Sequence, residues 1–438
     1  MPKSQLNWMV EWNAPIKLPV LTERLFQEGL GREDLVAILE ARNEELIQQK
    51  CGKQYDRAGN APYTRAGTRV RLLGTRFGVI LIKVNRVIDN STGVSFVPLW
   101  TDVLILPRRV YQEDVLCIAG HFSERMTYRN TNDELGRVAI GVPSSHTINR
   151  AIIEYGNELN SEIANRELTA MTHQPDGTKL HSQSGRKHDV NIILATGMGH
   201  MPRLRSLTVG KGWDAHVPAL KKTDFRDSKG NPVPPTTVSD MEKGLATMTT
   251  PLNGFWQPCL VHVPRHLGFE LWKDGIMEFE DRKGYVRTIT GLLRHLKNSV
   301  ACHLPKNEHD EIVHRIKQTT KEFRRWATIL LEQGMKRASF FLRRLSNAVT
   351  TFASLALRGV IIPWHNNLLE RLMGEVSKRC KHKWMSWTSR GAQALLTLLV
   401  VRVVEPDTHA AFWNRKIFGD AYTIPNMGVS ITRLGAEC

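Results

Sequence analysis

The chain has 438 residues, which exceeds the size of one ordinary hydrophobic core, so we expect two or more domains. Lysine and arginine total 60 against 43 aspartates and glutamates, and the excess of 17 positive charges is spread along the sequence. This charge favours a polyanionic partner, above all nucleic acid, although composition alone also fits a basic protein without such a partner.

The cysteine spacing and the hydropathy of the sequence indicate the cellular compartment. The six cysteines show no paired CxxC spacing, which argues against a disulfide framework and against a four-cysteine zinc site. The segment MPKSQLNWMVEW has no long apolar run, and no stretch of about 18 consecutive apolar residues occurs in the sequence. We therefore expect a soluble, unsecreted, cytoplasmic protein without a membrane partner.

The first predicted region, residues 1–62, is a helical segment. Residues 33–50 place apolar side chains at three, four and seven residue steps, which is a helical period. From Tyr63 the segment YTRAGTRVRLLGTRFGVILIKVNRVID is rich in β-branched and basic residues and has glycines around a turn, which predicts a strand pair. An ordinary solvated sheet face is one interpretation of its arginines. The other is contact with DNA phosphates, for which the candidates are Arg65, Arg69, Arg71 and Arg76.

Helices follow the strand pair and complete the second predicted region, residues 63–165. The segment YRNTNDELGRVAI predicts one helix, and GVPSSHTINRAIIEYGNELN predicts a turn with a serine cap and a second helix. Ile148 and Ile152 would face inward, whereas Asn149 and Arg150 would face outward. The arrangement resembles a DNA-binding helix-turn-helix with Asn149 and Arg150 as candidate base contacts, although many three-helix packings share this pattern.

From Arg166 onward, short apolar or alternating runs are separated by glycine, proline and charged turns, which predicts strands. Three strands, in ELTAMTHQPDGTKLHS, DVNIILATG and LRSLTVG, precede a helix in WDAHVPALKK, a fourth strand in PPTTVSD and a fifth in WQPCLVHV. A long helical stretch then covers residues 266–362. This is the order of an α/β RNase H-like catalytic core, here residues 166–265 and 363–438, with an all-helical insertion and a preceding mixed α+β DNA-binding region.

In an RNase H-like domain, the functional carboxylates come from the first strand, the end of the fourth strand and the first helix after the fifth. These positions offer Asp176 in PDGTK, Asp240 in VSDMEKG and Glu370 in NNLLER. Three carboxylates supply the oxygen ligands that Mg²⁺ or Mn²⁺ prefers, and two such ions activate a water or hydroxyl and stabilise the leaving oxygen of a phosphodiester. Clustered carboxylates also repel one another, so the site should lower stability until cations bind.

Two of these carboxylates have alternative interpretations. Pro175 lacks a backbone N–H and is awkward in a central strand, so we expect Asp176 just past the hydrogen-bonded ladder. Asp189 in KHDVNI is then a rival first carboxylate. The alternative for Asp240 is an ordinary helix cap, because it precedes a helix.

Two adjacent asparagines, Asn366 and Asn367, precede Glu370. We expect one of them to cap the helix and so to fix its direction, an arrangement that is good local chemistry even without catalysis. Basic side chains that follow on this helix and beyond it are candidates to face DNA, namely Lys378, Arg379, Lys381 and Lys383.

Together these segments resemble the DDE-type insertion-sequence transposases, in particular the groups related to the Mutator superfamily. DGTK, VSDMEKGL and NNLLERLMGEVSKRCKHK are similar to the three catalytic motifs of that family, and YTRAGTRVRLLGTRFG is similar to its basic, glycine-punctuated strand motif. QPCLVHVPRHLGFELW resembles the family's cysteine-x-x-histidine motif, here Cys259 and His262, which lies beside the catalytic pocket. Two clear ligands are too few for a structural zinc site, so we expect Cys259 to be buried with His262 near the active site.

The resemblance implies a transposase that binds the terminal inverted repeats of an insertion sequence, cleaves a phosphodiester at the element end and joins the 3′ hydroxyl to target DNA. It implies two Mg²⁺ or Mn²⁺ ions held by Asp176, Asp240 and Glu370. It also implies at least a homodimer, because two DNA ends must be held together, and a location on the nucleoid or chromosomal DNA. A DNA-binding regulator without catalysis and an RNase H-like nuclease that cuts without joining are the alternatives.

Overall fold

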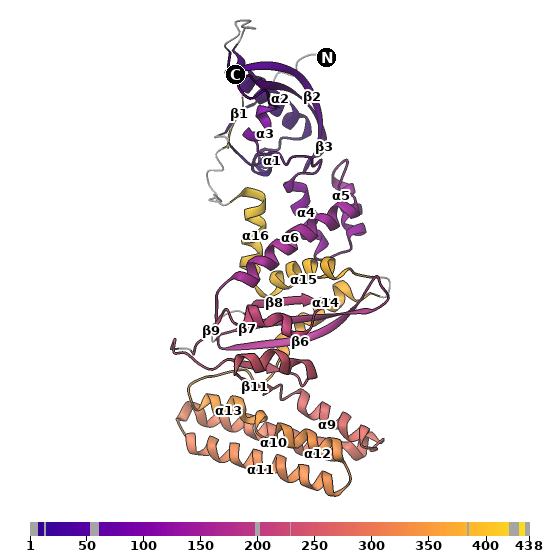
Figure 1. The fold of residues 1–438 in the computed structure, drawn as a ribbon, viewed down its shortest axis with the longest axis vertical. Coiled ribbons are helices and arrows are strands. Elements are labelled where there is room, and N and C mark those ends of the chain that lie inside the picture. Colours follow the sequence, from indigo (N-terminus) through magenta and orange to yellow (C-terminus); the bar gives the residue numbers. More distant parts are fainter. Residues whose placement is uncertain are drawn as a thin grey trace. The chain divides into compact units, whose positions relative to one another are not determined.

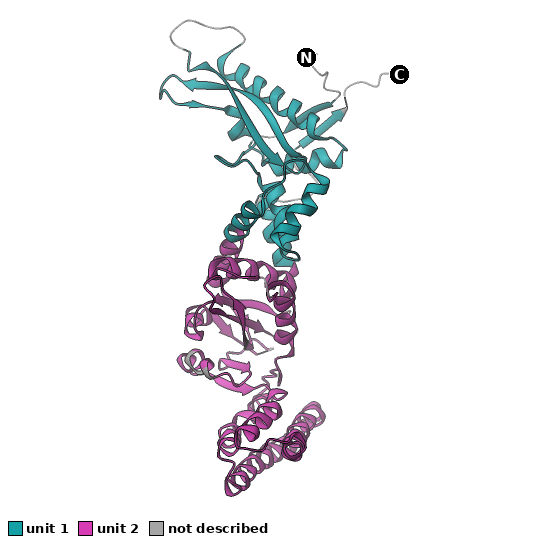
Figure 2. Cartoon of the chain, turned by 90° about the vertical axis from the view of Figure 1, so that its right-hand side faces the viewer, with its two compact units in different colours: residues 1–154, 407–438 teal, residues 155–406 magenta. Residues whose placement is uncertain are grey.

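The computed structural model describes residues 8–12, 15–52, 61–197, 202–227, 229–382, 385–419 and 429–433. The chain is a mixed α/β protein with two compact units: unit 1 comprises residues 1–154 and 407–438, and unit 2 comprises residues 155–406 (Figure 2). This division differs from the sequence-based one, which placed residues 407–438 in the RNase H-like region. Strand pairing explains the difference, because Val429 to Arg433 pair antiparallel with Trp12 to Trp8.

Unit 1 combines a three-stranded antiparallel sheet, a two-stranded sheet and helices. Its elements are β1 (Trp8–Trp12), α1 (Leu18–Gln27), α2 (Arg32–Cys51), β2 (Tyr63–Thr75), β3 (Gly78–Asp89), β4 (Ser95–Phe96), α3 (Pro98–Asp102), α4 (Glu113–Ser123), α5 (Tyr128–Val138), the first half of α6 (Ser145–Asn165), most of α16 (Pro406–Phe418) and β12 (Val429–Arg433). The helix expected over residues 33–50, the strand pair from Tyr63 and the two helices that follow it are confirmed.

The local sequence explains the two longest elements of this unit. At the start of α2 the Asp34 carboxylate accepts the N–H of Gly31 at 2.9 Å, which satisfies a donor that the helix leaves open. In the strand pair, alternate residues such as Leu73, Ile80 and Ile82 are fully buried. These residues form one core with the apolar side chains of α1 and α2. The hairpin therefore has one core face and one solvent face.

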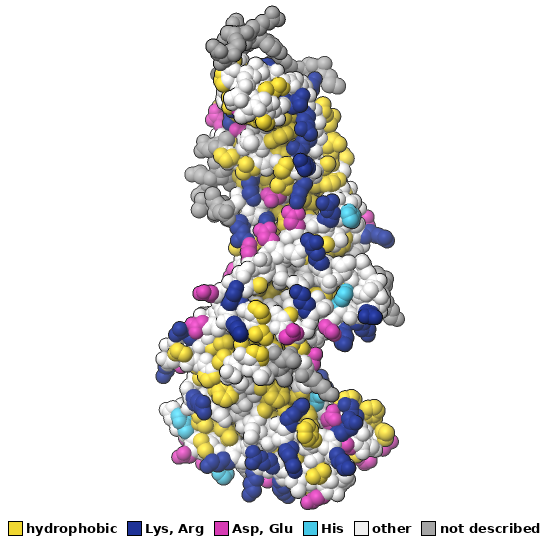
Figure 3. All heavy atoms as spheres, viewed as in Figure 1, with side chains coloured by type: hydrophobic (Ala, Val, Ile, Leu, Met, Phe, Trp, Pro, Cys, Tyr) yellow, Lys and Arg dark blue, Asp and Glu magenta, His cyan; other side chains and the backbone are white. Residues whose placement is uncertain are grey.

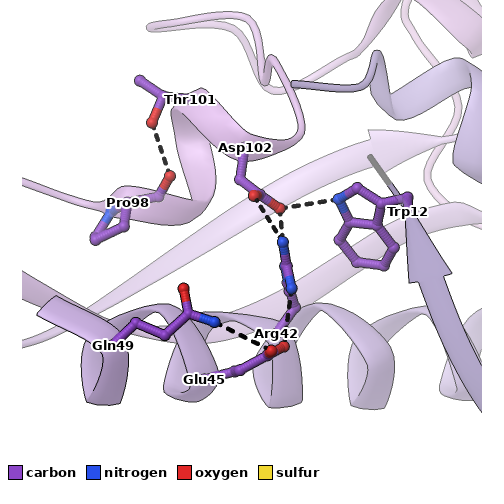
Figure 4. Close-up of polar contacts among 7 residues, drawn as sticks. All are labelled: Trp12, Arg42, Glu45, Gln49, Pro98, Thr101 and Asp102. Atoms are coloured by element: carbon purple, nitrogen blue, oxygen red, sulfur yellow. Dashed lines mark hydrogen bonds and ion pairs between the residues drawn. The ribbon is translucent and has the colours of Figure 1, made fainter. Parts of the chain in front are cut away.

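A buried carboxylate at the end of α3 holds three segments of unit 1 together (Figure 4). The two oxygens of Asp102 accept hydrogen bonds from Arg42 of α2 at 3.1 Å each, and one of them also accepts the Trp12 indole N–H at 2.9 Å. Arg42 additionally pairs with Glu45 at 2.9 Å, but Glu45 is half exposed. A buried charge is tolerated when it is paired and hydrogen-bonded, and Asp102 meets both conditions.

Replacing Asp102 with alanine should lower the free energy of unfolding by about 3 kcal/mol, because Arg42 would lose its buried partner and the Trp12 N–H its acceptor. Glu45→Gln, which removes the exposed partner of the same arginine, should cost less than about 0.5 kcal/mol. Urea denaturation of both variants measures the difference. Equal losses would show that Asp102 does not hold these segments together.

Unit 2 is built on a five-stranded mixed sheet with the strand order β11-β10-β6-β7-β8. Its elements are the second half of α6, β5 (Leu168–Ala170), β6 (Thr172–His181), β7 (Lys187–Thr196), β8 (Arg203–Val209), α7 (Val217–Leu220), β9 (Thr223–Phe225), β10 (Thr236–Ser239), α8 (Ala246–Thr249), β11 (Phe255–Pro258), α9 (His262–Lys273), α10 (Phe279–His303), α11 (His309–Glu332), α12 (Lys336–Leu345), α13 (Thr351–Ala356), α14 (Asn367–Cys380) and α15 (Ser389–Val404). The strands β6, β7 and β8 form an antiparallel meander, whereas β10 runs parallel to β6 and β11 parallel to β10.

The five strands predicted from the sequence are present, with two corrections. The fifth strand ends at Pro258 instead of continuing to Val263, because a tight turn follows in which the His262 N–H donates to the Cys259 carbonyl at 3.0 Å. The helix expected in WDAHVPALKK is reduced to a 3-10 turn and the single turn of α7. The short parallel pair of β5 and β9 was not predicted.

The helical stretch expected over residues 266–362 is confirmed as α9 to α13. Figure 1 shows these helices gathered beyond β11 at one edge of the sheet. Their buried side chains, such as Leu293 and Phe323, form one core cluster with Val238 of β10 and Leu260, which follows β11. The insertion is therefore anchored to the part of the sheet where β10 ends.

Helix α15 is anchored at the β8 edge. A Cβ atom on Gly156 of α6 would lie only 2.2 Å from the Ala394 carbonyl oxygen, so glycine permits the close approach of α6 and α15. Glu405, directly after α15, pairs with Arg166 at 2.7 Å and accepts the N–H of Leu204 of β8 at 2.7 Å. These contacts fix the helices that support α14.

Candidate active site

Asp176 lies inside the central strand β6, opposite Ile192 of β7. The expectation that Asp176 lies beyond the ladder is therefore wrong. The Ser182 N–H donates to the Arg186 carbonyl, which makes the even-numbered residues of β6 the ones that bond to β7. Pro175 is odd-numbered and points its missing N–H to the other edge, so it removes no bond between β6 and β7.

Asp240 comes directly after β10, the strand beside β6. These two parallel strands pair at Thr237 and His173, each three residues before its aspartate, so Asp240 and Asp176 lie at the same level of the sheet. The Asp240 side chain accepts the N–H of Glu242 at 3.1 Å, which forms a turn directly after β10. Asp176 and Asp240 thus come from neighbouring strands.

Glu370 lies in the first turn of α14, a helix that packs against β6. The expected asparagine cap is wrong, because Asn366 occupies the N-cap position but its side chain makes no capping bond and Asn367 is an exposed helical residue. The buried Asn366 amide instead donates to the Pro175 carbonyl at 3.2 Å. This bond joins the start of α14 to β6 one residue before Asp176, so it sets the position of Glu370.

The cysteine-x-x-histidine motif supports the same helix. The Cys259 thiol is fully buried, and burial raises its pKa although backbone N–H groups of Asn366, Val261 and His262 favour the thiolate. His262 Nε2 lies 3.1 Å from a carboxylate oxygen of Glu370. The expectation of a buried Cys259 with His262 nearby is therefore confirmed in geometry, with Glu370 as the partner of His262.

The electrostatics of Asp176 indicate that these carboxylates are close to one another. The pKa of Asp176 is raised to about 7, and burial is the largest cause. A hydrogen bond from the Gly177 N–H lowers this pKa, whereas the negative charges of Asp240, Glu370 and Glu242 contribute to the rise. The structure therefore brings the three predicted carboxylates together from three distant parts of the sequence.

Glu242 is a fourth carboxylate that sequence reasoning missed. One of its oxygens accepts the Trp213 indole N–H at 3.3 Å, and the other would lie 3.2 Å from a Cβ atom placed on Gly177. Burial raises the pKa of Glu242, and the charges of Asp240 and Asp189 add to the rise. Glu242 follows Asp240 by only two residues, and this spacing could have indicated that it lies near the site.

The rival first carboxylate, Asp189, lies on β7 opposite Lys179 and forms an ion pair with it at 3.3 Å. Both side chains are more than half exposed. Asp189 is absent from the charges that raise the pKa of Asp176. Asp176 is therefore the first-strand carboxylate that joins the cluster with Asp240 and Glu370.

The donor set of the cluster fits a hard divalent cation, because Mg²⁺ and Mn²⁺ prefer carboxylate and amide oxygens. Asn366 adds a buried amide oxygen that has no hydrogen-bond partner among the described residues. Within that described part of the chain, no three His, Cys, Asp or Glu side chains form a ready-made metal-binding group. The ligand atoms and the charge of these residues fit such an ion. Their side chains, however, are not already arranged as a set of metal ligands.

The arginines of the β2–β3 hairpin differ in their availability. Arg65 pairs with Glu44 at 3.1 Å, and Arg76 pairs with Glu23. Arg71 donates to the carbonyls of residues 106 and 109 at 2.6 and 3.1 Å. Arg69 has an exposed side chain. The protein itself thus engages three of the four candidate phosphate contacts.

The outward position predicted on α6 is confirmed for Arg150, which is exposed, whereas Asn149 is half-buried. On α14, Lys378 is exposed and pairs with Glu375 at 2.7 Å. The prediction for Arg379 is wrong, because this side chain is buried and its guanidinium lies 5.6 Å from the centre of the Trp387 ring. Lys383 lies outside the described residues.

Comparison with known proteins identifies no relative: no family model matches the chain, and no curated protein matches it. Across the described ranges, no helix has both the length and the apolar character needed to cross a membrane.

The raised pKa of Asp176 predicts a specific dependence of stability on pH without divalent cations. Between pH 3.8 and about 7 the unfolded chain loses this proton while the folded chain keeps it, so the free energy of unfolding falls as pH rises. Asp176→Asn removes this loss and should be more stable than wild type at pH 8 by about 2 to 4 kcal/mol, with a smaller difference near pH 4.

Urea denaturation in EDTA at the two pH values measures this effect. Asp189→Asn is the matched control, because its carboxylate is exposed, and it should change stability by less than about 0.5 kcal/mol at either pH. An Asp176→Asn variant that gains no stability at pH 8 would mean that burial and the neighbouring charges do not raise the pKa of Asp176 in the folded protein.

Proposed function

We propose that the chain is a DDE-type transposase with an RNase H-like core, which cleaves DNA at the ends of an insertion sequence and joins the freed 3′ end to target DNA. The observation that carries this proposal is the convergence of Asp176, Asp240 and Glu370 beside the carboxyl end of β10. In open α/β sheets, ligands commonly bind outside the carboxyl ends of the strands at the point where the strand order reverses, which here lies between β6 and β10.

The strand order supports the same proposal. An antiparallel meander of β6, β7 and β8, followed by parallel β10 and β11 on the other side of β6, is the arrangement that an RNase H-like core requires. The helical insertion between β11 and α14 keeps the carboxylates in the expected order along the chain.

Each residue of the site has a separate task under this proposal. Divalent cations held by Asp176, Asp240 and Glu370 would supply the Lewis acid that a phosphodiester reaction needs. His262 holds the Glu370 carboxylate through its Nε2 atom, and Asn366 holds the start of α14 on β6. A proton on Asp176 near neutral pH would oppose cation binding, so activity should rise with pH through this range.

The charge and the exposed basic side chains support DNA as the partner. Figure 3 shows Lys and Arg side chains spread over the visible face of each unit. In unit 1, Arg69 on β2 and Arg150 on α6 are the exposed candidates for phosphate and base contacts. Two DNA ends must be held in one reaction, so we propose at least a dimer that works on chromosomal DNA.

A cleavage assay tests the proposed function. Asp176→Asn, Asp240→Asn and Glu370→Gln should each reduce cleavage and joining by about a thousand-fold or more, because each removes a charge with little change of shape. Glu375→Gln, elsewhere on the same helix, is the control and should retain activity within about three-fold. The substrate is a labelled duplex that carries the DNA flanking the gene, with Mg²⁺ or with EDTA.

The products of this assay separate the alternatives. Joined products that require Mg²⁺ support a transposase, and cutting without joining would assign a nuclease. Binding without any cutting would assign a DNA-binding regulator. Retained activity in one of the three carboxylate variants would remove that residue from the site.

The contacts of the hairpin predict which arginine binds phosphate. Arg69→Ala should reduce the slope of log affinity against log salt by about 0.9, the value for one phosphate contact on duplex DNA. Arg71→Ala should leave this slope within about 0.3 and instead lower stability by about 1 kcal/mol, because its guanidinium bonds to two backbone carbonyls. Arg32→Ala, at an exposed site on α2, is the control for charge alone.

Fluorescence anisotropy at a series of salt concentrations gives the slopes. If Arg71→Ala reduces the slope and Arg69→Ala does not, Arg71 and not Arg69 is the phosphate contact of the hairpin.

A further inference from the structure

A groove of about 530 Å³ lies on one face of the β6–β7 hairpin, beside the carboxylate cluster. This hairpin extends past its neighbours, because β8 pairs with β7 only from Val190 onward and β10 pairs with β6 only at His173. The floor of the groove consists of three directly opposed pairs on one face: Gly177 with Asn191, Lys179 with Asp189, and His181 with Lys187. We call it the hairpin groove.

One end of the hairpin groove lies at the candidate active site. Gly177 follows Asp176 directly, and a Cβ atom at this position would lie 3.2 Å from both the Asn191 side-chain oxygen and a Glu242 oxygen. Glu242 lines the groove here and also acts on the pKa of Asp176. The Asp176 side chain points to the opposite face of β6, because neighbouring residues of a strand alternate between faces. The groove therefore adjoins the carboxylate cluster through Glu242 and runs from there toward the tip of the hairpin.

The remaining lining is basic. Lys179, Lys187 and Lys381 all line the groove with exposed side chains, and Lys381 comes from the end of α14, where it donates to the Thr178 hydroxyl. The pair of Lys179 with Asp189 is weak, because both partners are largely in water. Three lysines that converge on a polar groove favour a ligand with several negative charges and few apolar groups.

We propose that the hairpin groove binds the phosphodiester backbone of the DNA strand next to the bond that the carboxylates cleave; this proposal rests on the function proposed above. A strand that leaves the carboxylates meets this basic channel at Glu242, which both lines the groove and acts on Asp176. Lysine is suited to the task, since it binds phosphate as a mobile point charge and needs no fixed geometry. The groove positions the strand and reads no base sequence.

Salt-dependent binding tests the proposal without any cleavage. All proteins carry Asp176→Asn and are kept in EDTA, and the probe is the labelled duplex that carries the DNA flanking the gene. The triple variant Lys179→Ala, Lys187→Ala and Lys381→Ala should flatten the slope of log affinity against log salt by about two to three. The matched control removes three exposed lysines of unit 2 outside the groove: Lys221→Ala, Lys229→Ala and Lys317→Ala. It should change the slope by less than about 0.5.

Uncharged methylphosphonates, placed one at a time along the probe, locate the contact. At one or two neighbouring positions, a methylphosphonate should weaken DNA binding by the Asp176→Asn protein. It should leave binding by the triple variant unchanged, because the phosphate and the groove lysines are the two partners of one contact. If wild type cleaves the probe with Mg²⁺, these positions should adjoin the cleaved bond.

Two results would overturn the proposal. One is an equal slope for the triple variant and the matched control. The other is a polyglutamate peptide that competes with DNA only for the intact groove, which would assign the groove to an acidic protein partner. If the triple variant flattens the slope but the wild-type protein never cleaves DNA, the groove binds DNA and the proposed transposase activity is wrong. Failure of the groove proposal and failure of the proposed function therefore give different results.

Discussion

Burial of Asp176 beside the charges of Asp240, Glu242 and Glu370 is the constraint on which unit 2 depends. Keeping the Asp176 carboxyl in this place works against folding at neutral pH, as its pKa of about 7 indicates. Contacts elsewhere in the unit must therefore hold these side chains in place. The sheet supplies two of the residues from neighbouring strands, and α14 supplies a third from a segment that the helical insertion separates from them. Strain of this kind is typical of functional sites.

Hydrogen bonds at the start of α14 hold the arrangement. The Asn366 amide bonds to the backbone of β6, and His262 bonds to the Glu370 carboxylate. The fully buried Cys259 lies between these elements, and its thiol is close to the backbone N–H of Asn366. The cysteine-x-x-histidine motif thus needs no zinc to explain its residues, since Cys259 supports the helix start and His262 supports the glutamate.

The sequence predicted the elements well where hydrophobic periodicity is strong, as in α2, the β2–β3 hairpin and the insertion. It also indicated Asp176, Asp240 and Glu370, because their motifs lie at the expected places along the strand order. Sequence-based prediction failed where contacts between segments distant in sequence decide the position of a side chain or backbone group. Pro175 fits a central strand only because of its odd-numbered place in the ladder, and Asn366 bonds to β6 instead of capping its own helix. Arg379 was predicted to be exposed because it is charged, but its position on α14 is buried. Glu242 was missed because it lies near Gly177 in the fold but far from it in the sequence.

The central claim is that the four carboxylates form one site that a divalent cation stabilises. The most direct test is the free energy of unfolding at pH 8 as a function of free Mn²⁺ concentration. The account predicts that it rises with the logarithm of Mn²⁺ concentration above the dissociation constant, by about 1.4 kcal/mol for each ten-fold increase per ion bound. It predicts no such rise in the double variant Asp176→Asn and Asp240→Asn. A wild-type protein whose stability does not respond to Mn²⁺, or a double variant that responds equally, would contradict it.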